Sequence, residues 1–161
     1  MSKKKKEDAK NAPKVAVNRR ARFDYSFDEE HEAGIVLIGS EVKSIYAGKV
    51  NLTDGYCLVI NGEMFLMNVD VEPYDRAAAA FLPDRRRDRK LLLHRNEIES
   101  LARKVREKGY SLIPLETYFK RGKVKVKVGL GKGRGFHDKR HAIAEKETKR
   151  EVARVKVGQL D

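Results

Sequence analysis

The chain has 161 residues, with 36 Lys or Arg against 24 Asp or Glu and a formal net charge of +12. Residues 1–14 carry six Lys against two acids, and residues 131–161 carry nine cations against five acids, so each end contributes +4 of the total. Basic extensions on a nearly balanced body favour contact with nucleic-acid phosphates. A membrane surface is the weaker alternative, because neither extension has a continuous apolar face.

The remaining bounds concern compartment and domain number. Lys3–Lys6 is followed by no apolar stretch, so we expect no signal peptide, and no segment is long enough to cross a bilayer. Cys57 is the single cysteine, which excludes an internal disulfide and favours a soluble, cytoplasmic protein. We expect a flexible basic arm at 1–14, one domain at 15–130 that is large enough for a hydrophobic core, and a basic tail at 131–161 whose partner is a polyanion.

Alternation of apolar and polar residues dominates the body and predicts half-buried strands. The first predicted strand begins at Phe23, and the apolar run 35–38 predicts a second, more deeply buried strand. Asn61-Gly62 predicts a tight hairpin, because both positions tolerate positive φ. The strands are expected at 23–28, 35–38, 56–60, 63–67, 91–93, 110–119 and 123–128.

Two helices interrupt the strands. Ser40 is a candidate N-cap for a short helix that ends near Gly48. Ile98 and Leu101 begin an i, i+3, i+4, i+7 pattern that predicts a second helix, with Gly109 at its C′ position. Short antiparallel strands commonly close into a barrel, because closure removes exposed edges. We predict an all-β fold with flanking helices: an OB-fold-like, small closed antiparallel β-barrel.

The basic tail is predicted to be disordered alone or helical on binding. Between Ala144 and Glu151 it has no apolar side chain larger than alanine, so little burial offsets the entropy of ordering. In a helix over about 138–156, three cations would share one stripe at i+4 steps, where like charges destabilise a free helix. RNA phosphates would remove that repulsion. These three cations are Lys146, Arg150 and Arg154.

Two cationic stretches in the body are candidates for contact with RNA or DNA. Lys123, Lys125 and Lys127 alternate with valines, and same-face residues on a strand lie roughly 6.5 to 7 Å apart, close to phosphate spacing. They form either a phosphate rail or a solvated face that guards an edge strand. The block at 85–90 carries five cations in six residues, which a phosphate-binding loop explains better than a loop without a role.

Other motifs fail on detail. The glycines at 129, 131, 133 and 135 predict a hinge and no nucleotide cradle, because Gly133 follows Lys132 where a P-loop has Ser or Thr. His137 and His141 lack a third ligand and stand beside cations, so no metal and no other cofactor is expected. Carboxylates at 24, 28, 30 and 32 would suit a metal-dependent nuclease, but the solvent-facing side of an ordinary strand often carries the same pattern. We expect no enzymatic activity and no catalytic residue.

Five short blocks occur in the order found in one known family. They are Asn18-Arg19-Arg20-Ala21-Arg22, Glu32-Ala33-Gly34-Ile35, Glu41-Val42-Lys43-Ser44, Arg89-Lys90-Leu91-Leu92-Leu93 and Asp138-Lys139-Arg140. Each is short, but their shared order from about residue 15 to residue 140 is specific. The chain thereby resembles the SmpB, or SsrA-binding protein, family of bacterial trans-translation. Tyr46 and Gly135 depart from that pattern, which has Arg and Lys there.

The resemblance implies an OB-fold that binds the tRNA-like domain of tmRNA, the SsrA RNA, and delivers it to stalled ribosomes. There the nascent chain is tagged and the ribosome is rescued. The implied partners are tmRNA, the small-subunit decoding region and message channel of the stalled ribosome, and, through tmRNA, elongation factor Tu and alanyl-tRNA synthetase. The alternative is a structural ribosome-associated RNA-binding protein, which would share the composition and the barrel.

The resemblance also implies site residues. Asn18 would read a base edge, Glu32 would accept from a base amino group or a 2′-hydroxyl, and Leu92 would contact an exposed base. Phosphate contacts are expected from Arg19, Lys43, Arg89 and Lys90. In the tail, contacts with the ribosome are expected from Lys132, Arg134, Asp138, Lys139, Arg140, Lys146, Arg150 and Arg154.

Overall fold

A computed structural model describes residues 14–78, 80 and 82–158 of the chain. Apart from Lys14, the predicted N-terminal arm lies outside the described residues. Within the described part, no helix is both long and apolar enough to span a membrane.

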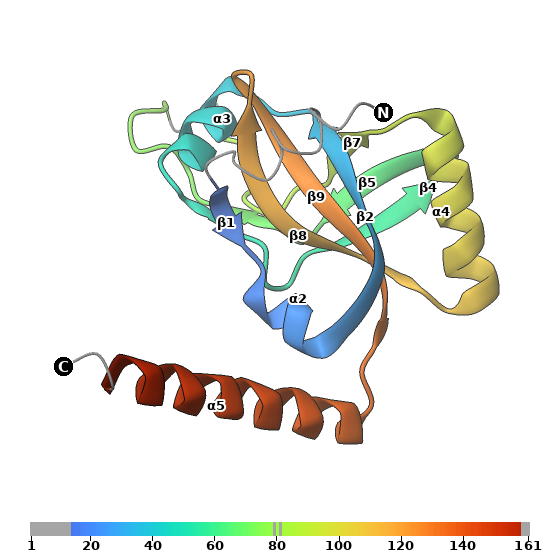
Figure 1. Ribbon diagram of the computed structural model, residues 1–161. Coiled ribbons are helices and arrows are strands. Elements are labelled where there is room, and N and C mark those ends of the chain that lie inside the picture. Colours follow the sequence, from blue (N-terminus) through green and yellow to red (C-terminus); the bar gives the residue numbers. More distant parts are fainter. Residues whose placement is uncertain (1–13, 79, 81, 159–161) are drawn as a thin grey trace.

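Within the described residues, seven strands form one antiparallel sheet with the pairing order β1-β8-β4-β5-β7-β2-β9. Because β9 also pairs with β8, the sheet closes into a ring, and β1 lies beside β8 outside that closure. This topology, visible in Figure 1, confirms the predicted mostly-β fold with flanking helices. The strands are β1 (Lys14–Val17), β2 (Tyr25–Ile35), β4 (Tyr56–Ile60), β5 (Glu63–Met67), β7 (Arg89–Leu92), β8 (Ser111–Lys120) and β9 (Lys123–Gly133).

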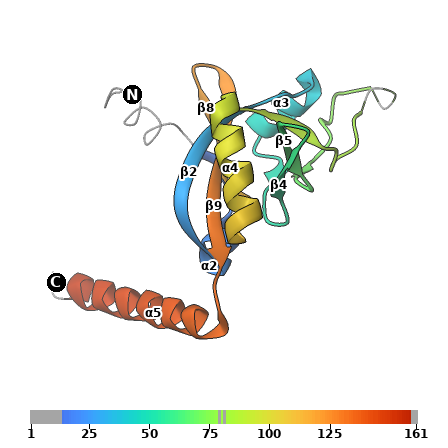
Figure 2. The same ribbon diagram turned by 90° about the vertical axis from the view of Figure 1, so that its right-hand side faces the viewer.

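Short elements complete the body, which we define as residues 14–133. Two small strands, β3 (Val50–Asn51) and β6 (Asp70–Val71), pair with each other. The helices are α2 (Arg19–Asp24), α3 (Gly39–Tyr46), α4 (Arg95–Lys108) and α5 (Phe136–Gly158). Figures 1 and 2 show α4 lying against the ring, whereas α5, the tail helix, extends away from it below α2.

The hydrophobic core fills the ring and the space beneath α4. Val126 and Val128 of β9, Met64 of β5, Leu91 of β7 and Leu101 of α4 are almost completely buried. Each such side chain stabilises the fold by about 1.5 to 3 kcal/mol relative to exposure. The alternation predicted in β9 is confirmed, because its valines point inward and its lysines outward.

Several predicted elements are confirmed closely. The hairpin turn joins β4 and β5 at the predicted residues, with Asn61 at φ 51° and Gly62 at φ 76°. Gly109 ends α4 in the left-handed conformation with φ 66°, as its C′ position predicted. The tail helix spans the region expected to be able to form a helix, and its folding on binding stays a prediction.

Other expectations about the N-terminal strands were wrong. Phe23 lies in α2, and the predicted buried strand at 35–38 does not form, because β2 ends at Ile35 and the chain turns into α3. Val36 and Ile38 are 47% and 46% exposed. The sequence reading also missed β1 and α2, since both are short and depend on distant contacts.

The predicted glycine hinge was wrong at three of its four positions, because Gly129, Gly131 and Gly133 all belong to β9. Gly129 and Gly131 lie inside β9, which runs three residues past the expected domain boundary at 130. A Cβ at Gly129 would lie 2.6 Å from Cδ1 of Phe27, and one at Gly131 would lie 2.7 Å from the same atom. These glycines therefore let the Phe27 ring pack over the strand.

Candidate nucleic-acid interface

Asn18 is buried and holds α2 against the sheet. Its Oδ1 accepts from the Ala21 amide at 3.0 Å, which caps the helix, and its Nδ2 donates to the carbonyls of Leu52 at 3.1 Å and Pro114 at 3.0 Å. The side chain is 2% exposed. The geometry therefore corrects the predicted base contact of Asn18: this amide positions α2, and its donors are already used.

Arg89 is also buried, at 1% exposure, so its predicted phosphate contact is corrected as well. Its guanidinium donates to Glu41 Oε1 at 2.9 Å and to the Val69 carbonyl at 3.0 Å. Glu41 is equally buried and accepts two further bonds from Arg87, at 2.8 and 2.6 Å. Burial opposes the charged form of Glu41, but hydrogen bonds from Arg87, the Ile38 amide and Arg89 hold its pKa below the usual value.

The rest of the cationic block at 85–90 is largely paired inside the protein. Arg85 makes a bidentate bond to Asp70 at 2.9 and 2.8 Å, and Lys90 lies 2.6 Å from Glu63. These carboxylates are distant from the block in the sequence, so the sequence alone did not show that they balance its positive charge. The structure assigns most of this block to joining α3, β6 and β7, and leaves Lys90 at the surface.

Glu32 lies on the outer surface of the ring, where β2, β9 and β8 run side by side. It accepts hydrogen bonds from the Tyr118 hydroxyl and from Lys120 Nζ at 3.1 Å. Partial burial opposes ionisation, but these two donors hold the pKa of Glu32 below its usual value. Glu32 is therefore a preorganised carboxylate that still has access to solvent.

The three lysines of β9 share this outer surface. Lys127 lies 3.2 Å from Glu116 and 3.7 Å from Glu30, so carboxylates on both neighbouring strands balance its charge. The edge-guarding alternative was wrong, because β9 pairs with β2 on one side and β8 on the other. The phosphate-rail alternative stays a prediction for Lys123, which is exposed at the start of β9.

Leu92 presents an apolar side chain beside this surface. It is 52% exposed and lies directly opposite Gly34 of β2, where an added Cβ would come within 3.3 Å of Leu92 Cβ. Glu32 lies two residues from Gly34 on the same face of β2, so Glu32 and Leu92 are diagonal neighbours. Lys90 follows on the same face of β7.

Arg19 and Lys43 are exposed but lie apart from each other. Arg19 begins α2, which leads into the first residue of β2. Lys43 lies on α3, which follows the last residue of β2. Lys43 Nζ is 5.3 Å from the Tyr74 ring centroid, a cation–π contact. The candidates of the body that reach the surface therefore lie along β2 and at both of its ends: Arg19, Glu32, Lys43, Lys90 and Leu92.

The tail is attached to the body at the start of its helix. The Arg134 amide donates to the Asp24 carbonyl at 2.8 Å, and Arg134 Nε donates to the Tyr25 carbonyl at 3.2 Å. Lys139 Nζ lies 3.2 Å from Asp24 Oδ1, which joins α5 to α2. Lys132 lies over the Tyr110 ring at 4.8 Å from its centroid.

Beyond this attachment the tail helix is exposed. As predicted, Lys146, Arg150 and Arg154 recur at i+4 steps along one side, and all three are exposed. Asp138 and Arg140 are exposed in its first turns. The tail helix thus presents cations on a helix that packs little on the ring.

The carboxylates of the nuclease alternative do not converge on one site. Asp24 ends α2 and faces the tail helix, Asp28 accepts from the Tyr110 hydroxyl, and Glu30 pairs with Arg22 at 3.0 Å. Each carboxylate has a protein partner of its own. The geometry therefore gives no support to the nuclease alternative.

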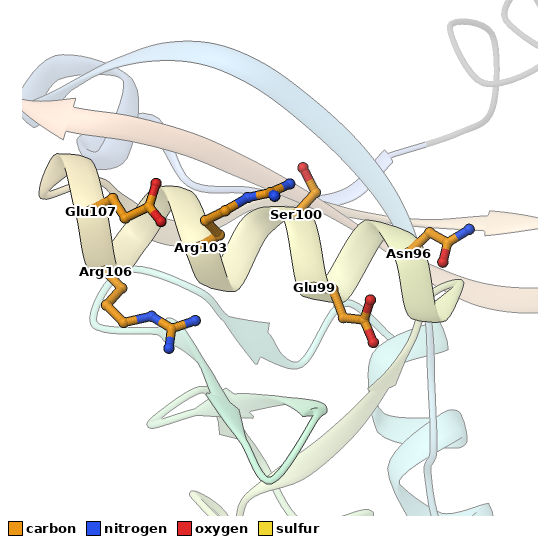
Figure 3. A pocket seen from close by; sticks show the side chains of 6 residues that line it. All are labelled: Asn96, Glu99, Ser100, Arg103, Arg106 and Glu107. Atoms are coloured by element: carbon orange, nitrogen blue, oxygen red, sulfur yellow. The ribbon is translucent and has the colours of Figure 1, made fainter.

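The outer side of α4 forms a shallow, open depression, shown in Figure 3. It has two glutamates and two arginines, so its charges of opposite sign balance. All of its lining residues come from one helix, and we interpret it as the solvated side of an amphipathic helix. These residues are Asn96, Glu99, Ser100, Arg103, Arg106 and Glu107.

Comparisons with known proteins agree on one family. A family model described as "SmpB protein" matches residues 15–157. An "SsrA-binding protein" of Symbiobacterium thermophilum is 52% identical over 148 residues, covering 91% of this chain and 93% of that protein. One from Thermobifida fusca is 49% identical over 156 residues, covering 96% of each. A solved structure described as "tmRNA-SmpB: a journey to the center of the bacterial ribosome" has a TM-score of 0.63 and 45% identity, covering 80% of this chain and 93% of that one.

Proposed function

The chain belongs to the SmpB protein family, and from that membership we propose that it binds the tRNA-like domain of tmRNA and delivers it to stalled ribosomes for trans-translation. The observation that carries this proposal is the family match over residues 15–157, which includes both the ring and the tail helix. Relatives named for binding SsrA, and a related structure described with tmRNA and the ribosome, support it.

The body is the part that binds tmRNA. Arg19, Lys43 and Lys90 contact phosphates, Glu32 accepts from a base amino group or a 2′-hydroxyl, and Leu92 packs on an exposed base. Lys90 exchanges its exposed ion pair with Glu63 for a phosphate at little cost, because such pairs contribute at most about 1 kcal/mol. Asn18 and Arg89 make no contact with the RNA and act on the position of other residues. Asn18 holds α2, which carries Arg19, and Arg89 anchors β7, which carries Lys90 and Leu92.

The tail is the part that enters the ribosome. Its exposed cations bind ribosomal RNA in the decoding region and the message channel when that channel is empty of message. The tail helix has 23 residues and so extends about 35 Å at 1.5 Å per residue. Lys139 exchanges Asp24 for an RNA phosphate on binding. The proposed contacts are Lys132, Arg134, Asp138, Lys139, Arg140, Lys146, Arg150 and Arg154.

The protein acts as a binding factor in the cytoplasm and catalyses no reaction. Elongation factor Tu and alanyl-tRNA synthetase meet it through tmRNA, which carries the features that both recognise. The ion-paired carboxylates of β2 support a role in binding, because each already serves a structural contact.

The test is a binding assay with a labelled tRNA-like fragment of tmRNA, measured against salt and in competition with ordinary tRNA. We expect selective, salt-dependent binding of the fragment. Equal affinity for unrelated folded RNAs would refute the proposal and favour a general structural RNA-binding protein, which should also sediment with ribosomes that are not stalled.

A truncated chain that ends at Gly135 separates the two parts. It keeps the β2–β9 pairing through Gly133 and both bonds of Arg134, so we expect an intact body with full affinity for tmRNA. We expect it to support no tagging on a message that lacks a stop codon. Loss of tmRNA affinity in this variant would contradict the division of roles.

A further inference from the structure

Tyr46 is a large aromatic side chain at the surface, at the end of α3. It is 78% exposed, more than any other large hydrophobic side chain of the described residues. A tyrosine in this position buries little apolar area, so packing within the protein does not account for it. Its ring is available to a ligand.

The ring is nevertheless held in place. Phe119 of β8 meets it nearly edge to face, with ring centroids 5.5 Å apart and an interplanar angle of 73°. This arrangement is favourable for aromatic pairs. Phe119 is itself partly buried against the hydrophobic core. Tyr46 is therefore a partly immobilised ring, which loses less entropy when a ligand binds.

Exposed cations lie on the two elements that hold this ring pair, α3 and the β8–β9 turn. Lys43 lies one turn earlier on the same side of α3, and it is exposed. Phe119 stands next to the β8–β9 turn, where Arg121 and Lys123 are exposed. Figure 1 shows α3 beside this end of the β8–β9 hairpin. An exposed aromatic ring among cations is the arrangement that stacks an unpaired base while its phosphates are bound nearby.

We propose that Tyr46, supported by Phe119, is a stacking platform for an unpaired nucleobase of the bound RNA, with Lys43 and Arg121 at the adjacent phosphates. This inference rests on the proposed function, which makes tmRNA the bound RNA. Ring stacking on a base releases no counterions, whereas phosphate contacts do. The contribution of Tyr46 to affinity is therefore independent of salt, and that of Lys43 is not.

The test compares Tyr46→Ala, Tyr46→Phe and Lys43→Ala in binding to the labelled tRNA-like fragment of tmRNA across a salt series. We expect Tyr46→Ala to lower the affinity about 5- to 150-fold with an unchanged salt slope. Tyr46→Phe keeps the ring and should bind as the parent does. Lys43→Ala should reduce the slope by about 0.7 to 0.9. Unchanged affinity in Tyr46→Ala, or equal losses in the Ala and Phe variants, would overturn the proposal.

A second measurement uses the absence of tryptophan from the sequence. Tyr46→Trp introduces a single tryptophan, whose fluorescence should be quenched when the fragment stacks on it. The matched control is Tyr56→Trp on β4, where the parent side chain is 40% exposed, and it should show no quenching. If the parent protein fails to bind the fragment, the proposed function itself falls. If it binds while Tyr46→Trp is not quenched, only the stacking platform falls.

Discussion

The body and the tail helix use the same cationic side chains in opposite ways. In the body, Arg85, Arg87 and Arg89 pair with two carboxylates brought in from other elements of the fold, which offset most of their charge. In the tail helix, Arg150 and Arg154 stand exposed in a row of like charges. A dense cationic block is therefore no measure of RNA binding by itself. What matters is whether the fold supplies its counterions.

We expect the largest effect from a substitution that breaks the buried ion pairs of the body. Arg89→Ala leaves Glu41 buried beside one arginine in place of two, and it removes the hydrogen bonds of the guanidinium to three backbone carbonyls. Removing one partner of a buried pair costs about 3 to 5 kcal/mol. We expect that loss in the free energy of unfolding, measured with urea. The matched control Arg85→Ala removes an exposed pair and should cost less than about 1 kcal/mol. Similar losses in both variants would contradict the comparison.

Acid gives a second measure of the same network. The pKa of Glu41 is held below its usual 4.5 in the folded protein. Its contribution to stability is thus fully present above pH 4.5 and is lost as the pH falls from there through the folded pKa. Unfolding free energies between pH 7 and pH 3 should decline in the parent protein, with a shallower decline in Arg89→Ala. An equal decline in both would show that Arg89 does not lower that pKa.

The next prediction tests whether Asn18 positions α2 or contacts the RNA directly. Asn18→Ala removes the cap of α2 and the donor to two buried carbonyls, so we expect a loss of about 1 to 3 kcal/mol in the free energy of unfolding. Its affinity for the tRNA-like fragment should stay within about twofold of the parent protein where both are folded. Asn96→Ala, on the solvated side of α4, is the matched control and should change neither quantity. A large affinity loss without a stability loss would restore Asn18 as a direct contact.

The tail gives a smaller effect with opposite signs. Replacing Lys146, Arg150 and Arg154 together by Gln removes the like-charge i,i+4 pairs 146/150 and 150/154 and the like-charge i,i+3 pair 146/149. It also removes two opposite-charge i,i+3 pairs, Glu147 with Arg150 and Glu151 with Arg154, so helix formation in the free 131–161 peptide should improve by only about 0.2 to 0.5 kcal/mol. Circular dichroism measures this gain. Ribosome binding should weaken, with a salt slope shallower by about 2. The control Lys149→Gln loses the support of Glu145 and should lower helicity. Strong helicity of the parent peptide in plain buffer would contradict folding on binding.

The sequence predicted local features better than partners. The Asn61-Gly62 turn and the Gly109 helix end were predictable, because each depends on the φ preference of its own residues. The pairing of Arg89 with Glu41 was not, because the two residues are 48 positions apart and only the closed sheet brings them together. The same holds for Asn18, whose acceptor at Pro114 lies 96 positions away.

In the tail helix, the exposed side chains were predicted and the contact with the body was not. Its row of cations was predicted correctly, because helical spacing alone determines it. Its attachment to α2 was missed, because Asp24 was expected on a strand with Phe23. No periodicity in the tail indicates a carboxylate partner in the body. Local chemistry thus predicted the exposed part of the site, whereas the buried part required the fold.

The smallest expected effect concerns the joint between the two regions. Asp24→Asn removes the partly exposed ion pairs with Lys139 and with Arg20 but keeps the backbone bond from Arg134, so stability should change by less than about 1 kcal/mol. The orientation of the tail helix should become less defined. Spin labels on Asn96→Cys and Glu147→Cys measure this, since burial raises the pKa of the Cys57 thiol and keeps it unreactive.

We expect a broader distance distribution in Asp24→Asn than in the parent protein. The control Asp28→Asn changes a carboxylate that faces Tyr110 instead of the tail helix and should leave the distribution as it was. If Asp24→Asn also leaves it unchanged, the bonds of Arg134 alone set the direction of the tail helix. Transfer of Lys139 from Asp24 to RNA would then leave the direction of the tail helix unchanged, and the two regions would be coupled through Arg134.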